Sequence, residues 1–159
     1  MAKPTLMTLP QHLGKHFRQA YTGGSFSERN LREELSDMPL SVARRTTPGG
    51  NSVLALVYHL HFYVRGVASV LAGGPLDTDD AASWATPAVT TEEAWRALVD
   101  EVLREGEVLA KALEALPEEG VWAPFHDPRY SSVFTNAMGV LEHVYYHLGQ
   151  IVIVKRAIS

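Results

Sequence analysis

Residues 139–150, GVLEHVYYHLGQ, lie inside a long apolar run and place His143 and His147 four positions apart. The run predicts a helix that begins near Ser131 or Ser132 and ends at about Ala157. Because residues i and i+4 lie one above the other on a helix, both imidazoles face the same side. A pair placed in this way can bind one metal ion together.

Two helices precede this run in the first half of the chain. One extends from about Thr8 to Tyr21 and is terminated by Gly23-Gly24. Another follows Pro48-Gly49-Gly50, with Asn51 or Ser52 as its N-cap. Its apolar residues recur at steps of four and three from Val53 to Leu71, a spacing typical of the seam of a helical bundle.

A third helix is predicted to start at Thr90-Thr91-Glu92-Glu93, interpreted as a capping box, and to end at Leu116 before a proline. Ser27 to Met38, with Ser27 as cap, is interpreted as a short helix or turn. Residues 73–90 are predicted to form a loop long enough to cross an end of the bundle, and Pro117 to Tyr130 a structured loop. Residues 1–159 are therefore expected to form a single all-α domain, a four-helix bundle with a long crossover between its second and third helices.

Composition narrows the functional classes. The chain has 159 residues, 46% of them apolar and 20% charged, which is ordinary for a soluble globular protein. A net charge of −4 gives no reason to expect nucleic-acid binding. The sequence contains no cysteine, which excludes disulfides and cysteine nucleophiles. No signal peptide and no apolar segment of roughly 18 residues is recognised, so a cytoplasmic protein without a membrane partner is expected.

A stripe of polar residues follows one side of the last predicted helix, at steps of three and four, between apolar neighbours. It consists of Asn136, Gly139, His143, His147 and Gln150. Buried imidazoles need partners, and a Zn, Ni, Fe or Cu ion supplies them. The alternative is that these histidines are exposed or bond to neighbouring side chains. The segment HVYYH also lacks the glutamate of the zinc-protease motif.

A third ligand is offered by Tyr58-His59-Leu60-His61. Residues two apart on a helix point about 200° apart, so only one of the two histidines easily faces the site. Arg65 lies one turn after His61 and indicates solvent there, which favours His59. Tyr63 is expected either to hydrogen-bond to a metal-bound water or substrate, or simply to pack in the core.

Other candidates receive less weight. His12 and His16 are also four apart, but they lie beside cations and are expected to be solvated or partly buried helix residues. His126 and Asp127 are candidates for a fourth ligand or an acid–base pair, or they belong to a loop that only caps the bundle. The three tryptophans are expected to be packing residues: Trp84, Trp95 and Trp122.

The chain resembles the DinB/YfiT-like superfamily of four-helix-bundle metalloproteins (DNA-damage-inducible proteins, not the polymerase that shares the name). The resemblance rests on Asn51–Leu60, on His143–His147 and on the Leu148-Gly149-Gln150 that follows, and it covers essentially the whole length. It implies a dimer and a divalent metal, often nickel or zinc, held by His59, His143 and His147 with water in the open positions. The second histidine of the earlier helix, His61, departs from the family pattern.

Members of this family include metal-dependent hydrolases and transferases or isomerases that use bacillithiol, mycothiol or glutathione. The expected function is therefore a metal-dependent enzyme that activates water or a small thiol against a small molecule, in detoxification or a stress response. No nearby Asp or Glu is evident as a general base, which weakens the hydrolase version. The alternatives are a non-catalytic metal- or ligand-binding bundle and a family member that has lost its metal.

Overall fold

A computed structural model describes residues 6–77 and 79–158, and this part of the chain contains helices and no strand. The long helices are α1 (Leu9–Thr22), α4 (Val53–Leu71), α6 (Glu92–Glu114) and α7 (Val133–Ile158). The short elements are α2 (Leu31–Leu35), α3 (Leu40–Ala43), α5 (Asp80–Trp84) and the 3-10 helices η1 (Glu118–Trp122) and η2 (Pro128–Tyr130). The predicted all-α four-helix fold is confirmed.

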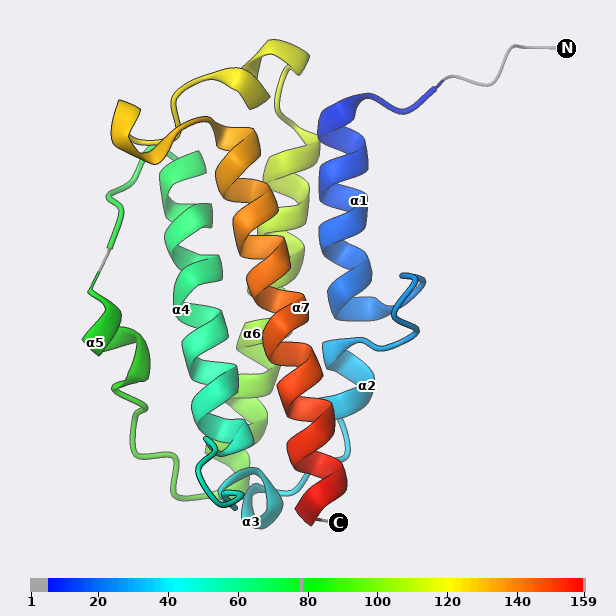
Figure 1. Cartoon of the computed structure of the whole chain (residues 1–159), viewed down its shortest axis with the longest axis vertical. Helices are drawn as coiled ribbons and strands as arrows, with labels where there is room; N and C mark the ends of the chain where they lie inside the picture. The colour runs from blue at the N-terminus through cyan, green and yellow to red at the C-terminus, as the bar shows by residue number, and fades with distance from the viewer. Residues whose placement is uncertain (1–5, 78, 159) are drawn as a thin grey trace, which may run out of the picture.

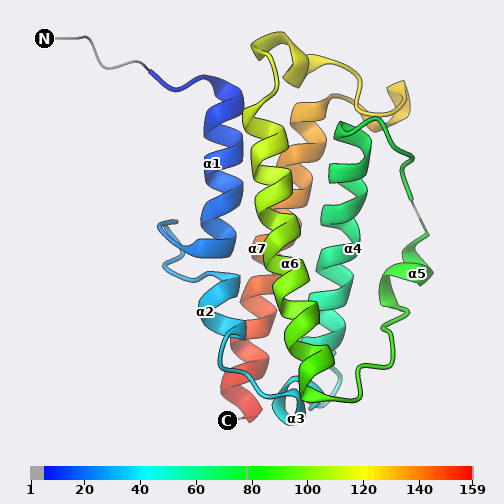
Figure 2. The same ribbon diagram turned by 180° about the vertical axis from the view of Figure 1, so that it is seen from behind.

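The direction of the helices follows from Figures 1 and 2. Helices α1 and α7 run one way and α4 and α6 run the other. The connection between α4 and α6 returns along the outside of α4, and α5 lies part-way along it, in contact with α4. This part of the chain was expected to be a loop without a helix, so α5 is a correction, and it proves important for the site.

Side-chain caps set the starts of the long helices. Ser52 caps α4 by accepting a hydrogen bond from the Ala55 amide at 3.2 Å, as predicted. Thr91 caps α6 and accepts from the Ala94 amide at 3.2 Å. The capping box predicted at residues 90–93 is wrong, because the third residue after the cap is Ala94, whose side chain has no group to return the bond.

The cap predicted for the short helix after α1 is also wrong. Asn30, not Ser27, caps α2, and its side chain accepts from the Glu33 amide at 3.0 Å. The Ser27 hydroxyl is used inside the preceding turn, where it lies 2.8 Å from the Ser25 hydroxyl. The helix therefore begins three residues later than the sequence indicated.

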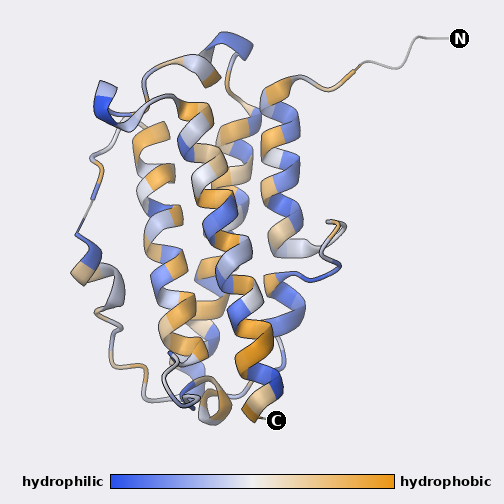
Figure 3. Cartoon of the chain, viewed as in Figure 1, coloured by the Kyte–Doolittle hydropathy of each residue, from blue (hydrophilic) through white to orange (hydrophobic). Residues whose placement is uncertain are grey.

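The core lies between the four long helices, and Figure 3 shows polar residues along the outward side of α1. Each of the four long helices contributes large, fully buried side chains to this core: Phe17 and Tyr21 of α1, Leu56 and Leu60 of α4, Trp95 and Leu109 of α6, and Leu148 and Ile151 of α7. Arg18 of α1 binds Glu107 and Glu114 of α6, with nitrogen–oxygen distances of 2.7 and 2.6 Å. The pair α1–α6 is thus held by both apolar packing and charge.

Helix α4 is the one described helix that is long and apolar enough to span a membrane, with a mean hydropathy of 1.3 over 18 residues. The expectation that no apolar segment reaches roughly 18 residues is therefore wrong for this helix. More than half of that window, 56%, is buried inside the protein, as expected for the core helix of a bundle. This arrangement is consistent with a soluble protein.

Candidate metal centre

Three histidines from two helices converge in the described part of the chain. His59 extends from α4, and His143 and His147 extend from the neighbouring antiparallel helix α7. Their candidate ligand nitrogens all lie within 4.8 Å of one another. Within residues 6–77 and 79–158 this is the one group of three or more such side chains close enough to hold an ion. The structure therefore brings together the residues that the sequence singled out.

His61 lies on a different face of α4. It is 2% exposed, and its Nε2 lies 3.6 Å from the Glu101 carboxylate of α6. The expectation that His61 points toward solvent is wrong, because α4 is covered on two sides, by α7 and by α6. The angle between the two histidines sends His59 to one interface and His61 to the other.

Hydrogen bonds orient the rings of His59 and His147. The Ser83 hydroxyl donates to the Asp80 carbonyl at 2.6 Å, so its oxygen accepts from the Nδ1–H of His59 at 2.8 Å. His147 donates its Nδ1–H to the Gln150 side-chain oxygen at 2.7 Å. These bonds assign the proton to Nδ1 in both rings and leave each Nε2 as a free electron-pair donor.

The environment keeps the imidazoles neutral. Burial, together with the proximity of His147 and His59, lowers the pKa of His143 to about 4. Burial likewise lowers the pKa of His59 and of His147. The Nε2 of His143 is buried and has no hydrogen-bond partner among the described residues. Three neutral imidazole nitrogens, one of which lacks a hydrogen-bond partner, are suitable ligands for a divalent cation.

Helix α5 completes the site. The Trp84 ring stacks on His59, with 3.7 Å between ring centroids and 16° between planes. Trp84 is therefore a packing residue, as expected, but its partner is a candidate ligand. Asp80 accepts a hydrogen bond from the Tyr63 hydroxyl at 2.7 Å, and the Tyr63 ring lies edge-on to His59 and His143.

Asp80 is the acidic residue that the sequence analysis did not find. It lines an open cavity of about 420 Å³ together with the three histidines, Tyr63 and Trp84. The cap of α5 was a usable signal, since Asp79 followed by Asp80-Ala-Ala-Ser is typical of a helix start. The open cavity gives a small molecule access to the candidate metal position.

The remaining candidates lie outside the cluster. His12 and His16 are exposed on α1, as expected. His126 is exposed, and Asp127 forms an ion pair with Arg129 at 2.8 Å. Neither His126 nor Asp127 joins the three histidines, so the structure gives no support for a role as a fourth ligand.

Comparison with known proteins now identifies the family. Residues 25–151 match the DinB superfamily. The chain belongs to the DinB superfamily. Neither the curated proteins nor the solved structures contain a significant match. In this DinB-like bundle, the three-histidine group is compatible with a divalent metal site, and the matched region contains all three residues.

Proposed function

We propose that this DinB-like protein is a metal-dependent enzyme that acts on a small molecule, with His59, His143 and His147 as the metal ligands. The observation that carries the proposal is the convergence of the three nitrogens within 4.8 Å on an open cavity. Zinc and nickel are the proposed ions, because neutral imidazoles suit both. When bound by three neutral ligands, such an ion lowers the pKa of water or of a thiol in its open position, and so supplies a nucleophile at neutral pH.

The surrounding residues have separate tasks in this proposal. Ser83 and Gln150 fix the rings of His59 and His147, which pre-organises the ligands. The Asp80 carboxylate is the proposed proton acceptor, because it lines the same cavity as the ligands. Tyr63 orients Asp80 through its hydroxyl, and Trp84 shields one face of His59 from water.

Asp80 bears on the choice between water and a small thiol as nucleophile. A carboxylate beside the cavity removes the main objection to hydrolysis, which was the lack of a general base. A low-molecular-weight thiol, such as bacillithiol, mycothiol or glutathione, also fits an open cavity of about 420 Å³. We therefore propose a hydrolase or a thiol-dependent S-transferase of the detoxification or stress type, working in the cytoplasm as a homodimer. The exposed Tyr146 and Ile153 on α7 support an association surface.

The first test is elemental analysis of untagged protein that has not met a chelator, beside the variant His143→Ala/His147→Ala. The matched control is His12→Ala/His16→Ala, which removes the other i, i+4 pair from an exposed face. We expect about one zinc, nickel or similar ion per chain in the wild type and the control, and none in the site variant. No metal in the wild type, even after the ion is added, would overturn the proposal.

The second test asks whether a metal-loaded protein is an enzyme. Ester and amide substrates and electrophiles with a small thiol are screened with wild type and with Asp80→Asn. We expect hydrolysis to fall by about 10²- to 10⁴-fold in Asp80→Asn if the carboxylate accepts the proton. Retained metal without any turnover would instead favour the non-catalytic metal-binding bundle.

A further inference from the structure

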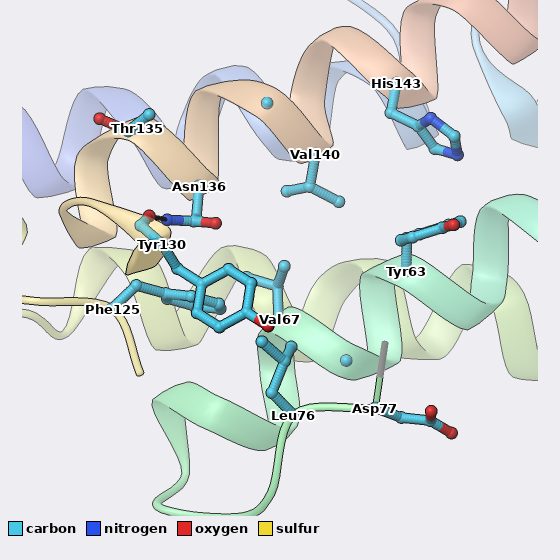
Figure 4. Close-up of a pocket in the computed structure, with 12 residues that line it drawn as sticks. Tyr63, Val67, Leu76, Asp77, Phe125, Tyr130, Thr135, Asn136, Val140 and His143 are labelled. Atoms are coloured by element: carbon cyan, nitrogen blue, oxygen red, sulfur yellow. Dashed lines mark hydrogen bonds between the residues drawn. The ribbon is translucent and has the colours of Figure 1, made fainter. Parts of the chain in front are cut away.

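A second cavity adjoins the metal centre and has no role in the function proposed above. It has a volume of about 290 Å³ and is lined by residues of α4 and α7, of the loop before α5 and of the segment around η2. Tyr63 and His143 line both this cavity and the metal cavity. Figure 4 shows Val67 of α4 and Val140 of α7 on facing sides, with Phe125 and Tyr130 at the end farther from His143.

Two helix glycines open this cavity. Gly66 on α4 and Gly139 on α7 both line it. Neither has a positive φ, and a Cβ added at Gly139 would meet no atom within 4 Å, while one at Gly66 would make only ordinary contacts at 3.9 Å. Since glycine inside a helix costs about 0.5–1 kcal/mol relative to alanine, neither backbone nor packing explains these two residues. Space for a ligand explains both.

The charged groups around the cavity disfavour an anionic ligand. Among the described residues that line it, Asp77 is the only acidic one. The Asp77 carboxylate accepts a hydrogen bond from the Asp79 amide at 3.0 Å and so serves the loop. No lysine or arginine is present there to compensate an anionic ligand, and an unpaired charge is expensive to bury.

One polar group at the far end is free to accept a hydrogen bond. Asn136 donates through its side-chain nitrogen to the carbonyls of Tyr130 and Ser132. No donor from the described residues reaches its side-chain oxygen, which Figure 4 shows on the cavity side. Asn136 and His143 are seven residues apart on α7, or about 10 Å at 1.5 Å per residue. A ligand that spans this distance would meet the acceptor at one end and the metal centre at the other.

We infer that this cavity binds the body of the substrate, and that the substrate is a neutral, compact apolar molecule of one or two rings with a hydrogen-bond donor for Asn136. This inference rests on the proposed function, because His143 joins the two cavities. A volume near the lower end of the range for ligand pockets, roughly 300–1,000 Å³, sets the size. Apolar lining supplies affinity, and the shared wall presents the reactive end of the molecule to the metal centre.

Binding of three probes to the purified full-length protein tests the inference. Indole is neutral and carries one N–H donor, 1-methylindole lacks the donor, and indole-3-carboxylate adds a charge. We expect saturable binding of indole by calorimetry or NMR titration, binding about fivefold weaker for 1-methylindole, and binding at least tenfold weaker for the carboxylate. Equal binding of indole and 1-methylindole would overturn the role of Asn136, and equal binding of the carboxylate would overturn the selection for neutral ligands.

Variants at two glycines of α7 locate the binding site. Gly139→Leu fills the cavity and is expected to weaken indole binding at least tenfold. Gly149→Leu is the matched control: its Cβ also meets nothing within 4 Å, and it does not line the cavity. Unchanged binding by Gly139→Leu, or no saturable binding of indole by the wild type, would overturn the inference.

The metal content is measured on the same samples, so the two proposals fail separately. If the wild type contains a full complement of metal but does not bind indole, the inference about the cavity is wrong and the metal centre is unaffected. If the wild type binds indole but takes up no metal, the cavity is a ligand site and the proposed metal-dependent enzyme is wrong.

Discussion

The bundle contains two pairs of neighbouring antiparallel helices in which glycines do opposite things. In α1 and α6, a Cβ at Gly14 would overlap the Ala110 carbonyl and one at Gly106 would overlap the Tyr21 ring. In α4 and α7, a Cβ at Gly66 or Gly139 would fit without displacement. The first pair uses glycine to bring helices together, and the second leaves room beside the candidate metal centre.

Polar groups divide less cleanly, because the Tyr21 hydroxyl of the α1–α6 pair is also buried without a partner among the described residues. Between α1 and α6, Arg18 is matched by two carboxylates at hydrogen-bonding distance. Between α4 and α7, His143 leaves a buried nitrogen without a partner among the described residues. The difference that remains is the space beside His143, since a buried nitrogen next to open cavities is suited to binding. The α1–α6 pair is closely packed, and the α4–α7 pair has room beside the candidate metal centre.

The largest expected effect on stability is that of Gly106→Ala. The new methyl group meets the Tyr21 ring, which is 1% exposed and stacked on Phe17 with 5.3 Å between centroids. We expect the free energy of unfolding to fall by about 2–3 kcal/mol through overpacking, measured by urea denaturation.

Two further variants sharpen this result. Gly149→Ala controls for the gain in helix propensity, since its methyl group meets no neighbour. In the double variant Gly106→Ala/Tyr21→Leu, most of the loss caused by the methyl group should disappear, because the ring it strikes is gone. If Gly106→Ala is as stable as the wild type, close contact does not distinguish the α1–α6 pair.

An intermediate effect is expected from Arg18→Met. Hydrogen bonds from Arg18 lower the pKa of Glu107 and of Glu114. Because the folded pKa values lie below the ordinary value of about 4.3, this stabilisation is present above that pH and is lost as the pH falls through the folded values. We expect the variant to be about 1 kcal/mol less stable at pH 7, since all three side chains are partly exposed and solvent screens them.

The pH dependence separates the ion pairs from packing by the arginine stem. The difference between Arg18→Met and wild type should shrink toward zero between pH 4 and pH 2, measured by urea denaturation at each pH. Arg129→Met, which removes an exposed partner of Asp127, is the control and should leave stability nearly unchanged at every pH, because solvent screens this pair. A difference that is constant with pH would show that the carboxylates contribute nothing to the α1–α6 pair.

Local signals in the sequence predicted the long helices and placed two of the three histidines on one helix face. Ser52 and the glycines after Tyr21 gave helix ends close to those observed, because caps act within one turn. The spacing of His143 and His147 placed both on one face for the same reason. The choice of His59 over His61 as the third residue of the group could be checked only in the structure, since both are buried and they differ in which helix covers them.

The missed features all depend on contacts between distant segments. Five residues, 80–84, are too few to show a helical period, and α5 is held where Ser83 and Trp84 meet His59, 24 residues away in the case of Ser83. Asp80 enters the site only through that contact. The cavity beside it was equally hidden, because a glycine that opens a cavity and one that permits close packing look alike in a sequence.

The smallest effect expected is that of Gly139→Ala, and its sign makes the comparison with Gly106→Ala decisive. Alanine at this position enters empty space, so only the gain in helix propensity remains. We expect the free energy of unfolding to rise by about 0.5–1 kcal/mol in urea denaturation. Gly149→Ala should give a similar gain, because its surroundings are equally open. A loss of stability in Gly139→Ala alone would mean that α7 needs glycine for its contact with α4, and the two helix pairs would then use glycine for the same purpose.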